Sequence, residues 1–104
     1  MSDSKKREQE AIDAARVEID RIDGEILRLL SERARHVRDI GDAKHRLGEP
    51  IYQPDREEKI FERLIAANPG PLDDGAIRRL FERILDEARR LERSVYRDDE
   101  DRGR

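Results

Sequence analysis

The sequence predicts an all-α fold with three helices, of which the first is very long. Apolar residues recur at steps of three and four residues over most of the chain, the spacing of a buried helix face. The four prolines fall at only two places: Pro50 and Pro54 flank one break, and Pro69 and Pro71 flank the other. No segment alternates apolar and polar residues as a half-buried strand does. We therefore expect a single helical domain over residues 1–104.

The first helix is expected from about Lys6 to Leu47, because one apolar stripe persists over that length. The stripe is formed by Ile12, Ala15, Ile19, Ile22, Ile26, Leu29, Val37, Ile40 and Leu47. Two positions within it hold cations instead, Arg33 and Lys44, which share one face about 16 Å apart. A charge on a buried face is costly unless something pairs with it. The two cations therefore predict an anionic ligand.

The second and third helices are delimited by residues typical of helix ends. The second is expected over residues 54–67, with Pro54 in its first turn. The third is expected over about 72–95, with Asp73 or Asp74 as its N-terminal cap. The polar ends of the chain are expected to fray at residues 1–7 and 97–104, which leaves about 8–96 ordered.

The composition is that of a highly charged but folded protein. Charged residues make up 47% of the chain and the net charge is −3, which argues against non-specific nucleic-acid binding, since that needs a basic face. There is no cysteine, so disulfides and thiolate chemistry are excluded. The N-terminal residues lack the apolar core of a secretory signal, and no run is long enough to span a membrane. We therefore expect a cytoplasmic protein.

The length of the first helix predicts a homodimer. A helix of about 40 residues is about 60 Å long, whereas a compact chain of this size is only about 30–35 Å across. The simplest cover for the excess stripe is a second copy, in an intertwined dimer. In an antiparallel dimer, Arg16 of one chain reaches the site of its partner. The alternative is a monomer whose long helix bends at Gly24 or Gly41 and folds back.

All three helices are expected to direct ionisable groups inward. Arg56 and Glu57 open the inner stripe of the second helix, and Glu92 lies on or beside the apolar face of the third. Together with the two stripe cations and a borrowed Arg16, they form a cluster with surplus positive charge, suited to a small dianion. Neither histidine has the paired spacing of a metal site, and no nucleophile motif is present. The chemistry is therefore expected to depend on positioning and electrostatics.

Simpler interpretations of these residues remain open. An arginine at a helix edge more often extends along the surface than contacts a ligand. Glu57 would also favour the helix dipole from the first turn. Glu92 would be a surface partner of Arg89 or Arg93 on its own helix.

Four segments, in this order and with these loop lengths, resemble the all-helical class of chorismate mutase, in its bacterial, monofunctional form. They are R-x-x-I-D-x-I-D-x-x-I-L-x-L-L-x-E-R (16–33), I-G-D-A-K (40–44), P-I-Y-Q-P-D-R-E (50–57) and L-F-x-x-I-L-x-E (80–87). The resemblance covers roughly residues 12–92. It implies an intertwined dimer of three-helix protomers with two active sites. The implied reaction is the pericyclic rearrangement of chorismate to prephenate, towards phenylalanine and tyrosine, without cofactor, metal or covalent intermediate.

The resemblance also implies a role for individual residues. Arg33 and, from the other protomer, Arg16 would bind the two carboxylates of the substrate, a task that suits bidentate arginine. Lys44 would hydrogen-bond the ether oxygen, where negative charge develops as the bond breaks. Glu92 would be the second catalytic group at that oxygen.

Two further substrate-binding positions match the family and two depart from it. Glu57 would bind the ring hydroxyl, and Arg56 would support that end of the site. Gln53 stands where well-known bacterial members have Asp, which weakens its expected contact with the hydroxyl. Ala88 stands where they have Ser, which removes a hydroxyl near a carboxylate.

Glu92 occupies a position where many members of the family have Gln. A carboxylate cannot donate a hydrogen bond unless it is protonated, so we expect Glu92 to act in its protonated form. The alternative enzyme is an isochorismate-pyruvate lyase, which forms salicylate and is similar in fold and site. A different class of alternative is a non-catalytic helical module that regulates a shikimate-pathway enzyme.

Overall fold

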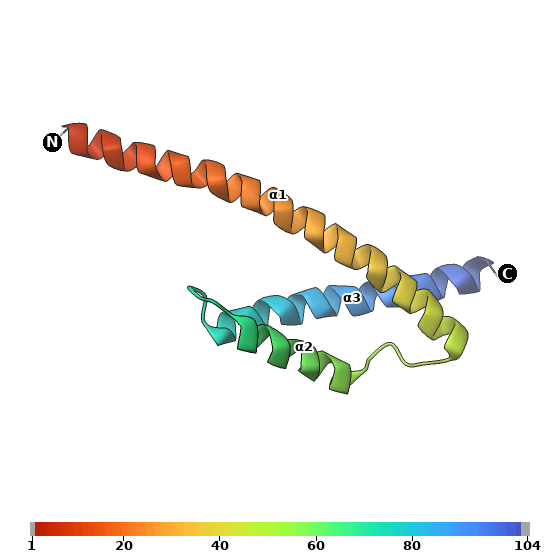
Figure 1. Ribbon diagram of the computed structural model, residues 1–104. Helices are drawn as coiled ribbons and strands as arrows, with labels where there is room; N and C mark the ends of the chain where they lie inside the picture. Colours follow the sequence, from red (N-terminus) through yellow and green to blue (C-terminus); the bar gives the residue numbers. More distant parts are fainter. Residues whose placement is uncertain (1, 103–104) are drawn as a thin grey trace. The chain divides into compact units, whose positions relative to one another are not determined.

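The computed structural model describes the backbone of residues 2–102 and the side chains of residues 2–97. It contains three helices, α1 (Ser2–Leu47), α2 (Pro54–Ala67) and α3 (Asp74–Arg102), and the described residues form no strand (Figure 1). The all-α fold with a very long first helix is therefore confirmed.

The helix ends follow from local chemistry. Helix α2 has the bounds expected from Pro54 and from the break that follows Ala67. Helix α3 is capped by Asp73, whose Oδ1 accepts a hydrogen bond from the backbone N–H of Ala76 at 2.7 Å. Both breaks are therefore where the prolines and caps predicted them.

Helix α1 is followed by Gly48, whose backbone is in the left-handed conformation. Gly48 has φ of +71°, a conformation that other residues rarely adopt. Its N–H bonds to the carbonyl of His45 at 3.3 Å, and the N–H of Glu49 bonds to the carbonyl of Lys44 at 2.9 Å. This pair of bonds is the Schellman motif, which satisfies the last carbonyls of a helix and turns the chain into the loop towards α2.

The helices extend beyond the expected ordered range. Helix α1 begins at Ser2 and α3 continues to Arg102, where fraying of 1–7 and 97–104 was expected. In α1, hydrogen bonds between polar side chains four residues apart stabilise the helix. For example, Nε2 of Gln9 donates to Oδ1 of Asp13 at 3.0 Å. Once a helix exists, each added residue costs little. Residues 1, 103 and 104 lie outside the described range.

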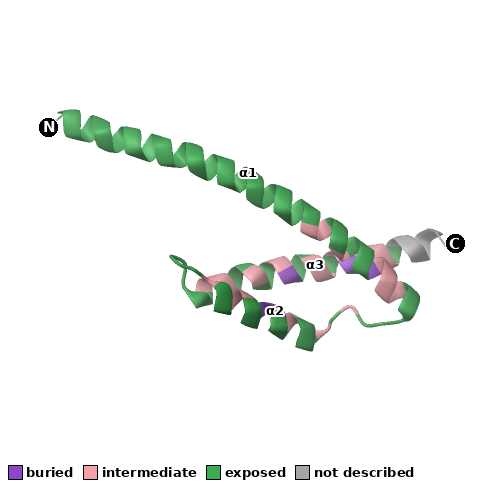
Figure 2. Cartoon of the chain, viewed as in Figure 1, coloured by how far each residue is buried: buried purple, intermediate pink, exposed green. Residues whose placement is uncertain are grey.

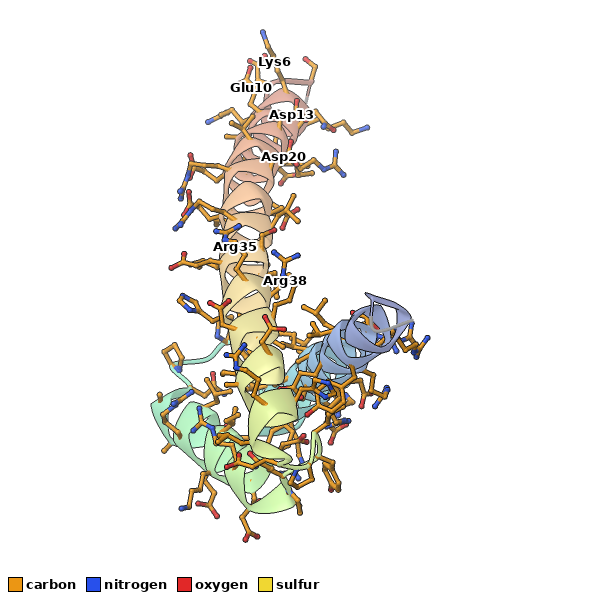
Figure 3. All side chains as sticks on the ribbon, turned by 90° about the vertical axis from the view of Figure 1, so that its right-hand side faces the viewer. Lys6, Glu10, Asp13, Asp20, Arg35 and Arg38 are labelled. Atoms are coloured by element: carbon orange, nitrogen blue, oxygen red, sulfur yellow. The ribbon has the colours of Figure 1, made fainter. Side chains whose placement is uncertain are left out.

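The chain divides into two compact units, Met1–Arg33 and Ala34–Arg104. In the first unit, every described residue from Ser2 to Glu32 is exposed (Figure 2). The exposure includes the apolar stripe, with Ile22 at 44% and Ile19 at 52%. Charged side chains such as Lys6, Glu10, Asp13 and Asp20 project from the same helix (Figure 3). No described residue buries this stripe, and the second copy expected to cover it stays a prediction.

In the second unit, α2 packs against α3 around a narrow core. The buried residues are Ile60, Phe61 and Leu85, with Leu64 and Phe81 packed against them. The guanidinium of Arg78 lies 4.3 Å from the centre of the Phe61 ring and closes one side of the core.

Candidate active site

Lys44 and Glu92 form a shielded ion pair between α1 and α3. The ammonium Nζ of Lys44 lies 3.1 Å from Oε1 of Glu92 and 3.4 Å from Oε2. The side chains are only 13% and 7% exposed. Nζ also donates a hydrogen bond of 2.9 Å to the carbonyl oxygen of Ile51, in the loop before α2. The ammonium is therefore held by α3 and by the loop before α2.

Gly41 allows α3 to approach this closely. A Cβ at residue 41 would lie 3.3 Å from Cγ and 3.4 Å from Cα of Glu92. Gly41 is one helical turn before Lys44, so the absence of its side chain leaves room for Glu92 beside the ammonium. The Gly and the Lys of the I-G-D-A-K segment therefore act together.

Glu57 is paired with Arg89, a residue that was considered only as a surface partner of Glu92. Nη1 of Arg89 donates to Oε1 and Oε2 of Glu57 at 2.5 and 2.6 Å. The side chains of Arg89 and Glu57 are 22% and 19% exposed. The sequence holds a signal for this placement, because Arg89 follows buried Leu85 by four residues and precedes Glu92 by three. Arg89 therefore continues the buried stripe of α3.

Arg89 is held by further contacts. Nη2 donates to Oδ1 of Asp86, and the guanidinium lies 5.4 Å from the centre of the Tyr52 ring. The hydrogen bond to Glu57 raises the pKa of Arg89, against the opposing effect of burial, and the charges of Glu57 and Asp86 raise it further. The Arg89 guanidinium is therefore positively charged and held in place by Glu57, Asp86 and Tyr52.

Three other residues expected at the site belong to this unit: Gln53, Arg56 and Ala88. Gln53 is half-buried and precedes α2, and its side chain makes no capping hydrogen bond, although its carbonyl accepts from the N–H of Glu57 at 3.1 Å. Arg56 is exposed and forms no ion pair among the described residues. Ala88 is half-buried, one helical turn before Glu92.

Arg16 and Arg33 belong to the first unit. Arg16 is exposed and Arg33 is half-buried. Their expected contacts with the carboxylates of a ligand stay predictions.

Tyr96 adds a polar contact that the sequence did not indicate. Its hydroxyl donates to the carbonyl of Glu49 at 3.3 Å, and its ring centre lies 4.4 Å from that of His45. Burial raises the pKa of Tyr96, and the negative charges of Glu92 and Glu49 add to the effect. The end of α1, the following loop and α3 are therefore joined beside the Lys44–Glu92 pair.

A known protein family covers the residues of this site. The profile described as chorismate mutase type II matches residues 15–93. This chain belongs to the chorismate mutase type II family. The match includes Lys44, Glu57, Arg89 and Glu92, so both ion pairs lie within the family region.

Solved chorismate mutase structures resemble the fold. A chorismate mutase from Thermus thermophilus, in the form called Form II, is 50% identical in sequence with a TM-score of 0.78. The similarity covers 79% of this chain and 93% of that one. The Form I structure from the same organism is 51% identical, with a TM-score of 0.72, and the similarity covers 74% of this chain and 96% of that one.

Two curated relatives named for chorismate mutase activity are longer than this chain. The bifunctional chorismate mutase/prephenate dehydratase of Neisseria gonorrhoeae is 44% identical over 77 residues, and that of Aquifex aeolicus is 38% identical over 90 residues. The alignments cover 74% and 83% of this chain. The chain spans 21% and 25% of those two proteins. It is therefore similar to a part of each.

Two other kinds of feature are absent from the part of the chain that the structure describes. No helix there is long and apolar enough to cross a membrane. The described residues also include no group of three or more His, Asp or Glu side chains placed to hold a metal ion.

Proposed function

We propose that this chorismate mutase family chain rearranges chorismate to prephenate by positioning and electrostatics. The observation that carries the proposal is the shielded Lys44–Glu92 pair within the family region. The reaction breaks a carbon–oxygen bond while a carbon–carbon bond forms, so the enzyme needs no nucleophile. Its task is to stabilise the charge that develops on the ether oxygen.

Lys44 is the group proposed to meet that charge. Its ammonium is held by Ile51 and Glu92, at 2.9 and 3.1 Å, so it is oriented before the substrate arrives. A preorganised donor in a shielded site stabilises charge more strongly than water does, because it need not reorient during the reaction. Glu92 would act at the same oxygen as a donor when its carboxyl is protonated.

The two carboxylates of the substrate are proposed to bind arginines. Arg33 would bind one and Arg16 of the partner subunit the other, each through paired N–H groups. The exposed apolar stripe of the first unit supports this homodimer, because a row of exposed isoleucines such as Ile19, Ile22 and Ile26 is expected to be covered. The proposed dimer interface therefore also brings Arg16 of the partner subunit to the proposed active site.

The ring hydroxyl is proposed to bind at the other end of the site. Glu57 would accept its hydrogen bond, with Arg56 supporting that end. Gln53 is close in sequence but contributes no charge, so Glu57 would carry this contact. We also propose a cytoplasmic location, with which the absence of cysteine is compatible.

A direct assay tests the function. The purified chain is incubated with chorismate and, separately, with isochorismate, and the products are identified by chromatography. We expect prephenate from chorismate, lost in Lys44→Met and retained in Arg83→Leu, a change at an exposed ion pair of α3. Salicylate and pyruvate from isochorismate, with no prephenate from chorismate, would identify a lyase instead. Failure to turn over either substrate would favour a non-catalytic module.

A further inference from the structure

One face of α3 carries two charged residues of opposite sign that reach different helices. Arg89 and Glu92 are three residues apart and therefore neighbours on the helix surface. Glu92 contacts Lys44 of α1, and Arg89 contacts Glu57 of α2. The mechanism proposed above uses Lys44, Glu92 and Glu57 and gives Arg89 no part.

The contact between Arg89 and Glu57 leaves the carboxylate able to bind a ligand. A single nitrogen, Nη1, donates to both oxygens of Glu57, at 2.5 and 2.6 Å. An ionised carboxylate offers about four lone-pair sites, so this contact leaves about two unused. The N–H of Glu57 is tied to the carbonyl of Gln53 at 3.1 Å, so the backbone is held as well.

Arg89 is itself restrained on more than one side. Its other terminal nitrogen donates to Asp86, one turn earlier in α3, and its guanidinium lies over Tyr52 of the loop. An arginine whose planar group is held in this way keeps its partner in one orientation. Most other ion pairs of α3 are more exposed to solvent than the Arg89–Glu57 pair. The side chains of Arg83 and Glu87, for example, are 70% and 49% exposed.

We infer that Arg89 is a positioning residue that holds the Glu57 carboxylate oriented for a hydroxyl group of the substrate. The inference rests on the proposed function and deepens it, because it assigns recognition of the ring hydroxyl to a pair instead of a single residue. Arg89 acts through Glu57 and touches no reacting atom. Arg89 thereby sets the preference for a substrate that carries this hydroxyl.

The experiment compares chorismate with an analogue that lacks the ring hydroxyl, using the full chain. The values of kcat and KM are measured for both substrates with the unsubstituted chain, Arg89→Leu, Arg89→Lys and the matched control Arg83→Leu. A site that binds a hydroxyl rejects a substrate without one. We expect Arg89→Leu to lose about tenfold in kcat/KM for chorismate, less than the roughly 10²-fold that a 1 Å misplacement can cost, and to change little with the analogue. Arg89→Lys should recover part of the loss, and Arg83→Leu should match the unsubstituted chain.

A second arm tests whether Arg89 acts through Glu57. In a Glu57→Gln background, Arg89→Leu should change kcat/KM for chorismate by less than about twofold, because coupled residues are not additive. If Arg89→Leu does not fold, as judged by its thermal transition, Arg89→Lys takes its place in both arms with a smaller expected loss.

Different outcomes overturn different claims. Equal losses with both substrates, or in both backgrounds, would show that Arg89 acts independently of Glu57 and would overturn the inference. An active unsubstituted chain with an unaffected Arg89→Leu would overturn the inference and leave the proposed function intact. An unsubstituted chain that does not turn over chorismate would overturn both.

Discussion

The ammonium of Lys44 lies 3.1 Å from the carboxylate of Glu92, and water reaches little of either side chain. Each charge has lost much of its hydration and depends on the other. Removing one partner of such a pair leaves an uncompensated charge, whereas replacing both with apolar residues is often neutral. The pair is therefore both a candidate catalytic unit and a constraint on folding.

The first prediction concerns stability. Glu92→Leu is expected to lower the free energy of unfolding by about 3 kcal/mol, because it strands the shielded Lys44 ammonium without its carboxylate partner. The double variant Lys44→Met/Glu92→Leu is expected to recover much of that loss. Urea unfolding followed by circular dichroism measures both. Losses that simply add in the double variant would show that the two residues are not coupled.

The second prediction concerns pH. The ion pair with Lys44 requires Glu92 to be ionised, whereas donation to the ether oxygen requires it to be protonated. If the protonated form acts, the rate depends on pH in a way that Glu92→Gln, which donates at every pH, does not share. The pKa of Tyr96 is raised by burial and then by Glu92 and Glu49, so the neighbouring phenol stays neutral while carboxyl groups titrate. The pH–rate profiles of the two proteins are compared over that range. Coincident profiles would mean that protonation of Glu92 plays no part.

The third prediction uses two glycines of α1. Gly24→Ala adds a Cβ with no atom within 4 Å, so it should stabilise the chain by about 0.5–1 kcal/mol through helix propensity. Gly41→Ala places its Cβ 3.3 Å from Cγ and 3.4 Å from Cα of Glu92, so the shielded Glu92 side chain must shift by a few tenths of an ångström. We expect Gly41→Ala to be less stable than Gly24→Ala by about 1–3 kcal/mol. Thermal unfolding of the two variants measures the difference, and equal stabilisation by both would argue against the close approach of α3.

Much of the fold is predictable because local signals agree. Pro54 and Asp73 mark helix starts by their own chemistry, and Gly48 permits the left-handed turn that ends α1. The chain ends were less predictable, because a polar sequence without apolar periodicity is compatible with a helix or a frayed end. Ser2 and Arg102 show that the helix continues in both cases.

The candidate site was predictable in part. Lys44 interrupts an apolar stripe, which revealed its inward position before any contact was known. Arg89 was missed because it stands in the run Arg89-Arg90-Leu91-Glu92-Arg93, where several charges compete for the same partners. The packing of α2 on α3 decides that Glu57 pairs with Arg89. The approach of α1 to α3 at Gly41 decides that Glu92 pairs with Lys44.

The fourth prediction tests the proposed dimer at the exposed stripe. Ile22 lies on the stripe and is 44% exposed, while Val17 lies off it on the same helix and is 66% exposed. Ile22→Asp should therefore shift the chain to monomers, because it places a charge in an apolar interface. Val17→Asp should leave the dimer intact and serves as the matched control. Sedimentation at several concentrations measures both, and a monomeric unsubstituted chain would contradict the dimer itself.

The fifth prediction tests whether two chains share each site. Arg16→Ala and Arg33→Ala are each expected to be nearly inactive, because each removes one carboxylate contact from every site in its own homodimer. When the two are mixed and exchange subunits, a hybrid dimer contains one site that lacks both arginines and one that retains both. Half of the sites in each hybrid should therefore be active. Exchange is verified by mass spectrometry with one chain isotopically labelled, and the turnover of the mixture is compared with that of each variant alone. If verified hybrids show no recovery of activity, Arg16 does not contribute to the active site of its partner. The apolar stripe would then form a dimer interface only.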